Sequence, residues 1–379
     1  MNSSPGKQIY DLGLEENPMP PPIDLKKVLI KNNDEPNRKK KLKNLLETDN
    51  IIIAHGLKPL LYITQLAFSK AFPEGTICHI IPYCPSYKYQ SDWININKIK
   101  IPCNKKWKVT YNGLDKALKD TTFPRLVFFN NANNPSGCIY NKTELGKLAK
   151  IFNKYKCIVL SDERYDKLVY EKYREEYGSI SNHYSNTIIA NCLSNNWSGN
   201  NKYGWLKFPK NIINDELLKL YKFSSSITSL ICNNPNEKLH NVAVEALSLS
   251  KNTINYMEFQ NKMFNEINSY CHEKLENMKI KCSITKSAWY KLLNFNHYKK
   301  KLNKINIVTS DELCKYLSEK LNIITVSGSV FGIEKTLIIR ISFIDVKINY
   351  KSFLTTSNAY NYVNVKKCLE KLEYWLSNL

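Results

Sequence analysis

Arginine is scarce in this chain, and its scarcity limits what the large positive charge can mean. Five arginines stand among 55 basic residues, which leaves 50 lysines, and the formal net charge is +21. A charge of this size favours a nucleic-acid partner. Arginine, however, makes most of the bidentate contacts that recognise bases and phosphates. We therefore expect no specific nucleic-acid partner. Weak binding of polyanions at low salt stays open, and the basic runs at 38–41 and 299–301 are interpreted as solvated surface.

Three further absences narrow the class of protein. No run of about 18 apolar residues occurs, so no membrane span is expected. The first seven residues lack the apolar core of a secretory signal, so we expect a cytoplasmic protein. None of the eleven cysteines belongs to a C-x-x-C pair, and scattered cysteines of this kind are usually reduced, partly buried apolar residues. We expect neither disulfides nor a metal site.

The chain length, the composition and the order of apolar segments predict an α/β fold. The 379 residues suffice for two domains, and a composition of 43% hydrophobic and 23% charged residues is that of a soluble globular protein. Short apolar runs alternate with helical periodicity, which is typical of a mainly parallel sheet covered by helices. Polar residues follow these runs, at the edge where open α/β sheets place ligands. The expected strands are Ile51–Ala54, Thr76–Ile81, Leu126–Phe129, Cys157–Leu160 and Thr187–Ala190, and the expected helices are Pro59–Phe72 and Thr143–Lys156, with Thr143 as N-cap.

The remaining segments complete the expected domain organisation. Residues 8–22 are rich in proline and predict an extended arm. Residues 23–48 predict short helices, 82–87 a turn, and 238–280 long helices. Strands are expected at 289–293, 322–326 and 337–342, and a last helix at 362–377. We expect a large domain over residues 40–250 and a smaller one over 251–379, which residues 1–39 join as an N-terminal arm.

Four motifs appear in a characteristic order along the chain. Asn134-Pro-Ser-Gly137 is a turn after an expected strand, and Ser161-Asp-Glu-Arg-Tyr165 follows the next strand. Downstream come the segment Asn186–Trp205, and then Ser327–Gly332 followed by Arg340. Together these motifs resemble those of class I aminotransferases, enzymes that use pyridoxal phosphate and have the fold-type-I architecture. The resemblance implies an α/β fold in which helices sandwich a mainly parallel sheet, with a smaller α+β domain beside it.

The resemblance also implies roles for individual residues. Asn134 and Tyr165 would bind the phenolic oxygen of the cofactor, and Asp162 would hold its pyridine nitrogen protonated. Arg340 would clamp the carboxylate of the substrate, an amino acid or a 2-oxo acid, through a bidentate pair. Gly56 would supply the phosphate-binding turn at a helix N-terminus. The family completes its site across a subunit interface, so the resemblance implies a homodimer.

The residue that should bond covalently to the cofactor is missing. Within Asn186–Trp205, the position of the Schiff-base lysine is Asn195. A carboxamide nitrogen is neither basic nor nucleophilic, so Asn195 cannot form that bond. Other positions of the same site also depart from the family: Cys84 replaces a stacking aromatic, Leu57 a hydroxyl residue that binds phosphate, Cys192 a serine, Lys202 a phosphate-binding arginine, and Glu15 a glycine. A carboxylate at position 15 should repel a substrate carboxylate.

Three functions are compatible with this pattern. The first is an aminotransferase-like protein that is impaired or inactive in transamination, with weak or lost binding of pyridoxal phosphate. The second is an active pyridoxal-phosphate-dependent aminotransferase or lyase with a different base, which the persistence of Asn134, Asp162, Tyr165 and Arg340 supports. The third is a non-enzymatic binding or scaffold protein on the same fold. We favour the first, because several independent parts of the cofactor site are lost together.

Overall fold

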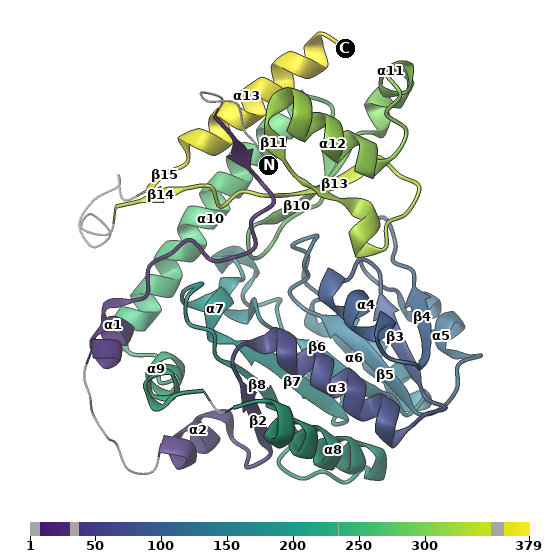
Figure 1. Cartoon of the computed structure of the whole chain (residues 1–379), viewed down its shortest axis with the longest axis vertical. Coiled ribbons are helices and arrows are strands. Elements are labelled where there is room, and N and C mark those ends of the chain that lie inside the picture. Colours follow the sequence, from purple (N-terminus) through teal and green to yellow (C-terminus); the bar gives the residue numbers. More distant parts are fainter. Residues whose placement is uncertain (1–7, 31–37, 234, 350–359) are drawn as a thin grey trace.

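The computed structural model describes residues 8–30, 38–233, 235–349 and 360–379 (Figure 1). Its larger sheet has seven strands in the order β2-β8-β7-β6-β5-β3-β4. Strand β8 runs antiparallel to both of its neighbours, and every other pair in this sheet is parallel. The predicted α/β fold with a mainly parallel sheet is therefore confirmed. The strands are β2 (Ile51–Ala54), β3 (Thr76–Ile80), β4 (Asn97–Ile101), β5 (Arg125–Asn130), β6 (Ile158–Asp162), β7 (Thr187–Cys192) and β8 (Gly204–Lys207).

Helices cover both faces of this sheet because its central strands are apolar on both sides. In β5, Leu126 and Phe128 enter one hydrophobic core, and Val127 and Phe129 enter the other. The sequences of such strands are continuous apolar runs, without the alternation of apolar and polar residues found in strands with one exposed face. The first core includes residues of α3 (Leu57–Ala71), α4 (Pro85–Asp92) and α8 (Asp215–Ile231), and the second includes residues of α5 (Tyr111–Leu118) and α6 (Lys142–Lys154).

A second, antiparallel sheet lies in the upper part of Figure 1, in the order β12-β13-β10-β9. Its strands are β9 (Lys281–Cys282), β10 (Tyr290–Asn294), β12 (Val326–Ser327) and β13 (Ile338–Ser342). The long helix α10 (Lys251–Asn277) leads from α9 (Glu237–Leu247) to this sheet, and α11 (Lys299–Lys304), α12 (Ser310–Leu321) and α13 (Val363–Ser377) lie in the same part of the molecule. A further two-stranded ladder joins β14 (Lys347–Ile348) to β15 (Tyr360–Asn361).

The N-terminal arm joins this upper part rather than the larger sheet. Its strand β1 (Tyr10–Asp11) pairs in parallel with β11 (Ile323–Ile324). Helices α1 (Ile23–Ile30) and α2 (Arg38–Leu46) follow, and both contact α9. The shortest helices are α7 (Leu193–Asn196) and the 3-10 turns η1 (Asp166–Leu168), η2 (Glu171–Tyr173), η3 (Ile180–Asn182), η4 (Asn296–Tyr298) and η5 (Gly328–Phe331).

Some local predictions were wrong. Helix α6 begins at Lys142, and its N-cap is Asn141, not Thr143, because Asn141 and Glu144 form a reciprocal capping box. The segment expected as a turn at 82–87 contains the start of α4, which has Pro85 at its first position. Strand β4 was not anticipated, because its lysines interrupt the apolar pattern at the sheet edge. Within the described ranges, no helix is long and apolar enough to cross a bilayer.

Candidate functional site

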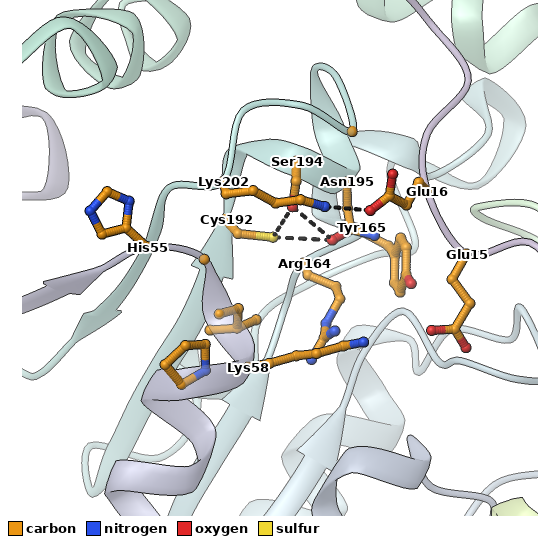
Figure 2. Close-up of a pocket in the computed structure, with 14 residues that line it drawn as sticks. Glu15, Glu16, His55, Lys58, Arg164, Tyr165, Cys192, Ser194, Asn195 and Lys202 are labelled. Carbon is orange, nitrogen blue, oxygen red and sulfur yellow. Dashed lines mark hydrogen bonds and ion pairs between the residues drawn. The ribbon is translucent and has the colours of Figure 1, made fainter. Parts of the chain in front are cut away.

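A cavity of about 220 Å³ lies where β6 and β7 end, at the start of α3 and beside the N-terminal arm (Figure 2). Six of the predicted site residues line it: Gly56, Leu57, Tyr165, Cys192, Asn195 and Lys202. The arm contributes Glu15 and Glu16, and Arg164 and Lys58 add cationic side chains. The remaining predicted residues, Cys84, Asn134, Asp162 and Arg340, are buried and do not belong to the lining.

The glycine turn at the start of α3 depends on a close approach between two backbones. Gly56 has a φ of 87°, which favours glycine. A Cβ on Gly204, at the start of β8, would lie 2.5 Å from the carbonyl carbon of Gly56, so only glycine fits there. This packing brings the N-terminus of α3 to the cavity. Leu57 is 4% exposed and supplies no hydroxyl, whereas Lys58 in the same turn supplies an amine.

Asn195 lies on α7 at the wall of the cavity. Its Oδ1 accepts a hydrogen bond from the Cys192 thiol at 3.1 Å and a longer one from the Ser194 hydroxyl at 3.5 Å. Its backbone carbonyl accepts from the Asn17 amide at 2.8 Å. Figure 2 shows the hydrogen-bonded side chains of Cys192, Ser194 and Asn195, close to Lys202. The carboxamide is thus held in a local hydrogen-bond network at the position predicted for the cofactor lysine.

Asp162, at the end of β6, is fully buried and already has a cationic partner. Arg164 Nε lies 2.9 Å from its Oδ1, and the second guanidinium nitrogen lies 2.5 Å from its Oδ2. The Tyr87 hydroxyl, on α4, also donates to Oδ2. Arg164 lines the cavity and Asp162 does not. The carboxylate expected to face a pyridine nitrogen is therefore covered by a guanidinium of the same chain.

Arg340 is fully buried on β13, where the rings of Tyr290 and Phe331 lie 4.6 and 5.1 Å from its guanidinium carbon. One guanidinium nitrogen donates to Glu15 Oε1 at 2.7 Å and to Asn134 Oδ1 at 3.2 Å. The other donates to the Gly13 carbonyl at 3.0 Å. Arg340 therefore brings Asn134 and the arm together. Glu15, which was expected to repel a substrate carboxylate, is itself paired with this arginine.

Burial is the largest single influence on the pKa of Glu15 and raises it, but the neighbouring cations Arg340, Lys58 and Arg164 together outweigh burial. The net result is a pKa below the ordinary value of a glutamate. Glu15 is therefore a carboxylate at neutral pH. Glu15, Lys58 and Arg164 line the cavity. Glu15 and Arg164 are already paired within the chain, with Arg340 and Asp162 respectively.

The other predicted residues have local partners. The Tyr165 hydroxyl lies 3.1 Å from that of Tyr290, and burial raises the pKa of Tyr165. Lys202 pairs with Glu16 at 2.5 Å, an exposed contact of the kind that contributes little to stability. Cys84 is the N-cap of α4 and packs in the apolar core, outside the cavity lining. It cannot take the place of a stacking aromatic there.

Sequence reasoning missed three residues that pair with predicted site residues: Arg164 and Tyr87 with Asp162, and Glu16 with Lys202. Arg164 had a usable signal, since it is one of five arginines and stands two positions after Asp162 at the end of a buried strand. Tyr87 had none, because its contact with Asp162 spans 75 positions. The pairing of Glu16 with Lys202 likewise depends on how the arm is placed.

Comparison with known proteins identifies the family. The model of aminotransferase class I and II matches residues 32–348, so the chain belongs to this family. Members of the family act on amino and oxo acids and normally use pyridoxal phosphate.

Individual relatives agree with this assignment. The chain is 26% identical over 304 residues to an aspartate aminotransferase of Pyrococcus horikoshii, covering 79% of this chain and 72% of the relative. It is 28% identical over 302 residues to an aspartate aminotransferase of Bacillus sp. YM-2, covering 78% and 72%. Among solved structures, an aspartate aminotransferase double mutant of Thermus thermophilus has a TM-score of 0.77 at 18% identity, covering 97% of this chain and 91% of that chain. The structural likeness shows the fold.

Glu163 provides a pH-dependent prediction beside the site. Burial raises its pKa from 4.5 to about 7, although the hydroxyls of Ser161 and Ser179 donate to its Oε1 at 2.7 and 2.5 Å. The folded state therefore keeps a proton that the unfolded chain loses, and stability should fall as pH rises from about 4.5 through 7. Glu163→Gln should remove this fall and raise the free energy of unfolding at pH 8 by up to about 3 kcal/mol.

Urea unfolding at pH 5 and pH 8 checks this expectation. The exposed neighbour Glu175 supplies the matched control, and Glu175→Gln should leave the pH dependence of the wild type unchanged. Equal pH dependence in wild type and Glu163→Gln would contradict the prediction.

Proposed function

We propose that this chain is a member of the aminotransferase class I and II family that is impaired or inactive in pyridoxal-phosphate-dependent transamination. Its cavity would retain affinity for small carboxylates of the amino-acid or 2-oxo-acid class. The observation that carries the proposal is Asn195, whose carboxamide stands on α7 at the cavity wall and is hydrogen-bonded to Cys192. A carboxamide cannot become the nucleophile that this chemistry requires.

The residues present do not fit the family cofactor. The carboxylate of Asp162 is paired with Arg164 and Tyr87, so it is not free to pair with a pyridinium. Lys202 is paired with Glu16 and offers one point of charge rather than an arginine fork. The cofactor phosphate would be left with the backbone amides at the start of α3 and the amine of Lys58. We therefore derive no catalytic step through pyridoxal phosphate.

A second candidate, an enzyme that uses a different amine, is favoured by one observation. The Lys58 side chain lines the cavity, and within the part of the chain that the structure describes its amine has no hydrogen-bond partner. Lysine amines can act as nucleophiles towards carbonyl groups. Lys58 is therefore the residue to examine if the protein proves active.

The experiment that tests the proposal is reduction with borohydride after incubation with pyridoxal phosphate, followed by peptide mass mapping. An aspartate aminotransferase treated in parallel is the positive control. We expect no single lysine to carry the adduct in this protein. A stoichiometric adduct on Lys58 or Lys202 would refute the proposal and establish the second candidate.

The broader assignments belong to the same proposal. We propose a homodimer, a cytoplasmic location, and a division into residues 1–39, 40–250 and 251–379. The contacts of the arm with β11 and β13 support the grouping of the first and last of these segments. Sedimentation at micromolar concentration tests the dimer, and a monomeric mass would contradict it.

A further inference from the structure

The N-terminal arm is anchored on both sides of Glu15 and Glu16. Before them, the Leu12 amide donates to the Ile324 carbonyl at 2.9 Å, and the Ser342 amide donates to the Leu12 carbonyl at 2.7 Å. After them, the side-chain amide of the buried Asn17 donates to the Asn195 backbone carbonyl at 2.8 Å and to Gln260 Oε1 at 3.2 Å. The two glutamates between these anchors are therefore held against the cavity.

Glu15 meets the arginine that the chain would use for a carboxylate ligand. The Arg340 side chain is 0% exposed, whereas the Glu15 side chain is 40% exposed. Among the described residues, Glu15 is the carboxylate that pairs with Arg340. A buried guanidinium without a counterion is costly, so this pair stabilises the closed arrangement of the arm.

The geometry of the Glu15–Arg340 contact would allow another carboxylate to displace Glu15. Glu15 uses one carboxylate oxygen and one guanidinium nitrogen, so the pair is not bidentate. Arg340 Nε, buried, has no hydrogen-bond partner among the residues that the structure describes. A carboxylate that engages two guanidinium nitrogens forms a stronger pair than a single contact does. Rotation of the half-exposed Glu15 side chain, without unfolding of the anchored arm, would free the site.

We propose that Glu15 is an internal ligand of Arg340, so that the arm keeps the carboxylate site occupied and free carboxylates must compete with it. The inference rests on the proposed function, which assigns small carboxylates to this cavity. Glu16 acts differently, because it pairs with Lys202 at the exposed rim. Lys58 and Arg164 stand near Glu15 and would favour a free anion once the Glu15 charge is removed.

Calorimetric titration with pyruvate, a simple 2-oxo acid, tests the proposal on the full-length protein. The variant Glu15→Gln keeps the length and the hydrogen-bonding capacity of the side chain but removes its charge. We expect its Kd for pyruvate to be lower than that of the wild type by about tenfold or more, because the competing carboxylate is gone. The matched control Glu175→Gln removes an exposed charge that lies outside the cavity lining, and it should leave the Kd unchanged.

Two further variants test whether the gain in affinity depends on Arg340 and on the side chain at position 15. Arg340→Lys in the Glu15→Gln background should abolish the gain, because lysine loses the fork. Glu15→Ala repeats the test without a side chain that could still accept from Arg340. Equal affinities of wild type, Glu15→Gln and Glu15→Ala would overturn the inference, and so would an equal gain in Glu175→Gln.

The pyruvate titration tests the internal ligand independently of the mass-mapping experiment that tests the proposed function. Pyruvate titration needs neither pyridoxal phosphate nor turnover, so a lysine adduct found by mass mapping would refute the proposed function and leave the Glu15 result standing. Unchanged pyruvate affinity would refute the internal ligand while the missing adduct still supported impaired transamination.

Discussion

Replacement of Arg164 by alanine is expected to lower the free energy of unfolding by about 3–5 kcal/mol. The substitution leaves the Asp162 carboxylate buried without its cation, with the Tyr87 hydroxyl and the backbone amide at position 164 as remaining donors. A buried charge that loses its counterion costs much more than an exposed one. Urea unfolding of wild type and variant at pH 7 measures the difference.

Two controls separate this effect from the general cost of losing an arginine. Arg174 is exposed, and Arg174→Ala should change stability by less than about 0.5 kcal/mol. The double variant Asp162→Asn/Arg164→Ala removes the stranded charge and should recover most of the loss. A cost below about 1 kcal/mol for Arg164→Ala would show that Asp162 does not depend on this guanidinium.

The features that sequence predicted well are those fixed by local patterns. The continuous apolar runs in β5 and β6 predicted a doubly covered parallel sheet, and the polar residues after them predicted the edge where the cavity lies. The position of Asn195 at the cavity followed from its place in the segment after β7. These predictions needed only strand periodicity and motif order.

The features that sequence could not supply depend on contacts between distant segments. Glu15 reaches Arg340 across 325 positions, so its role as an occupant depends on the path of the arm. Arg164 is close to Asp162 in sequence, but the spacing does not determine the direction of its side chain. The contact with the Asp162 carboxylate could therefore not be predicted. The cap of α6 shows the same limit locally, since Asn141 and Thr143 are both good N-cap residue types.

The Asn195→Lys variant tests how far one residue explains the expected loss of transamination. We expect its kcat/KM with aspartate as amino donor to stay about 100-fold or more below that of an aspartate aminotransferase assayed in parallel. The new amine supplies a nucleophile, but Arg164 still covers Asp162 and Glu16 still engages Lys202. A loosely held ligand keeps the reacting atoms out of position, and a misplacement of about 1 Å can cost on the order of 100-fold.

Asn200→Lys adds the same charge at an exposed position beyond α7 and should show no activity. Arg164→Ala in the Asn195→Lys background removes the guanidinium that pairs with Asp162, and it should raise the affinity for pyridoxal phosphate above that of Asn195→Lys alone. If Asn195→Lys alone reached the rate of the reference enzyme, the covered carboxylate and the paired Lys202 would be irrelevant to function. In that case the site would have lost one residue rather than its ability to hold the cofactor.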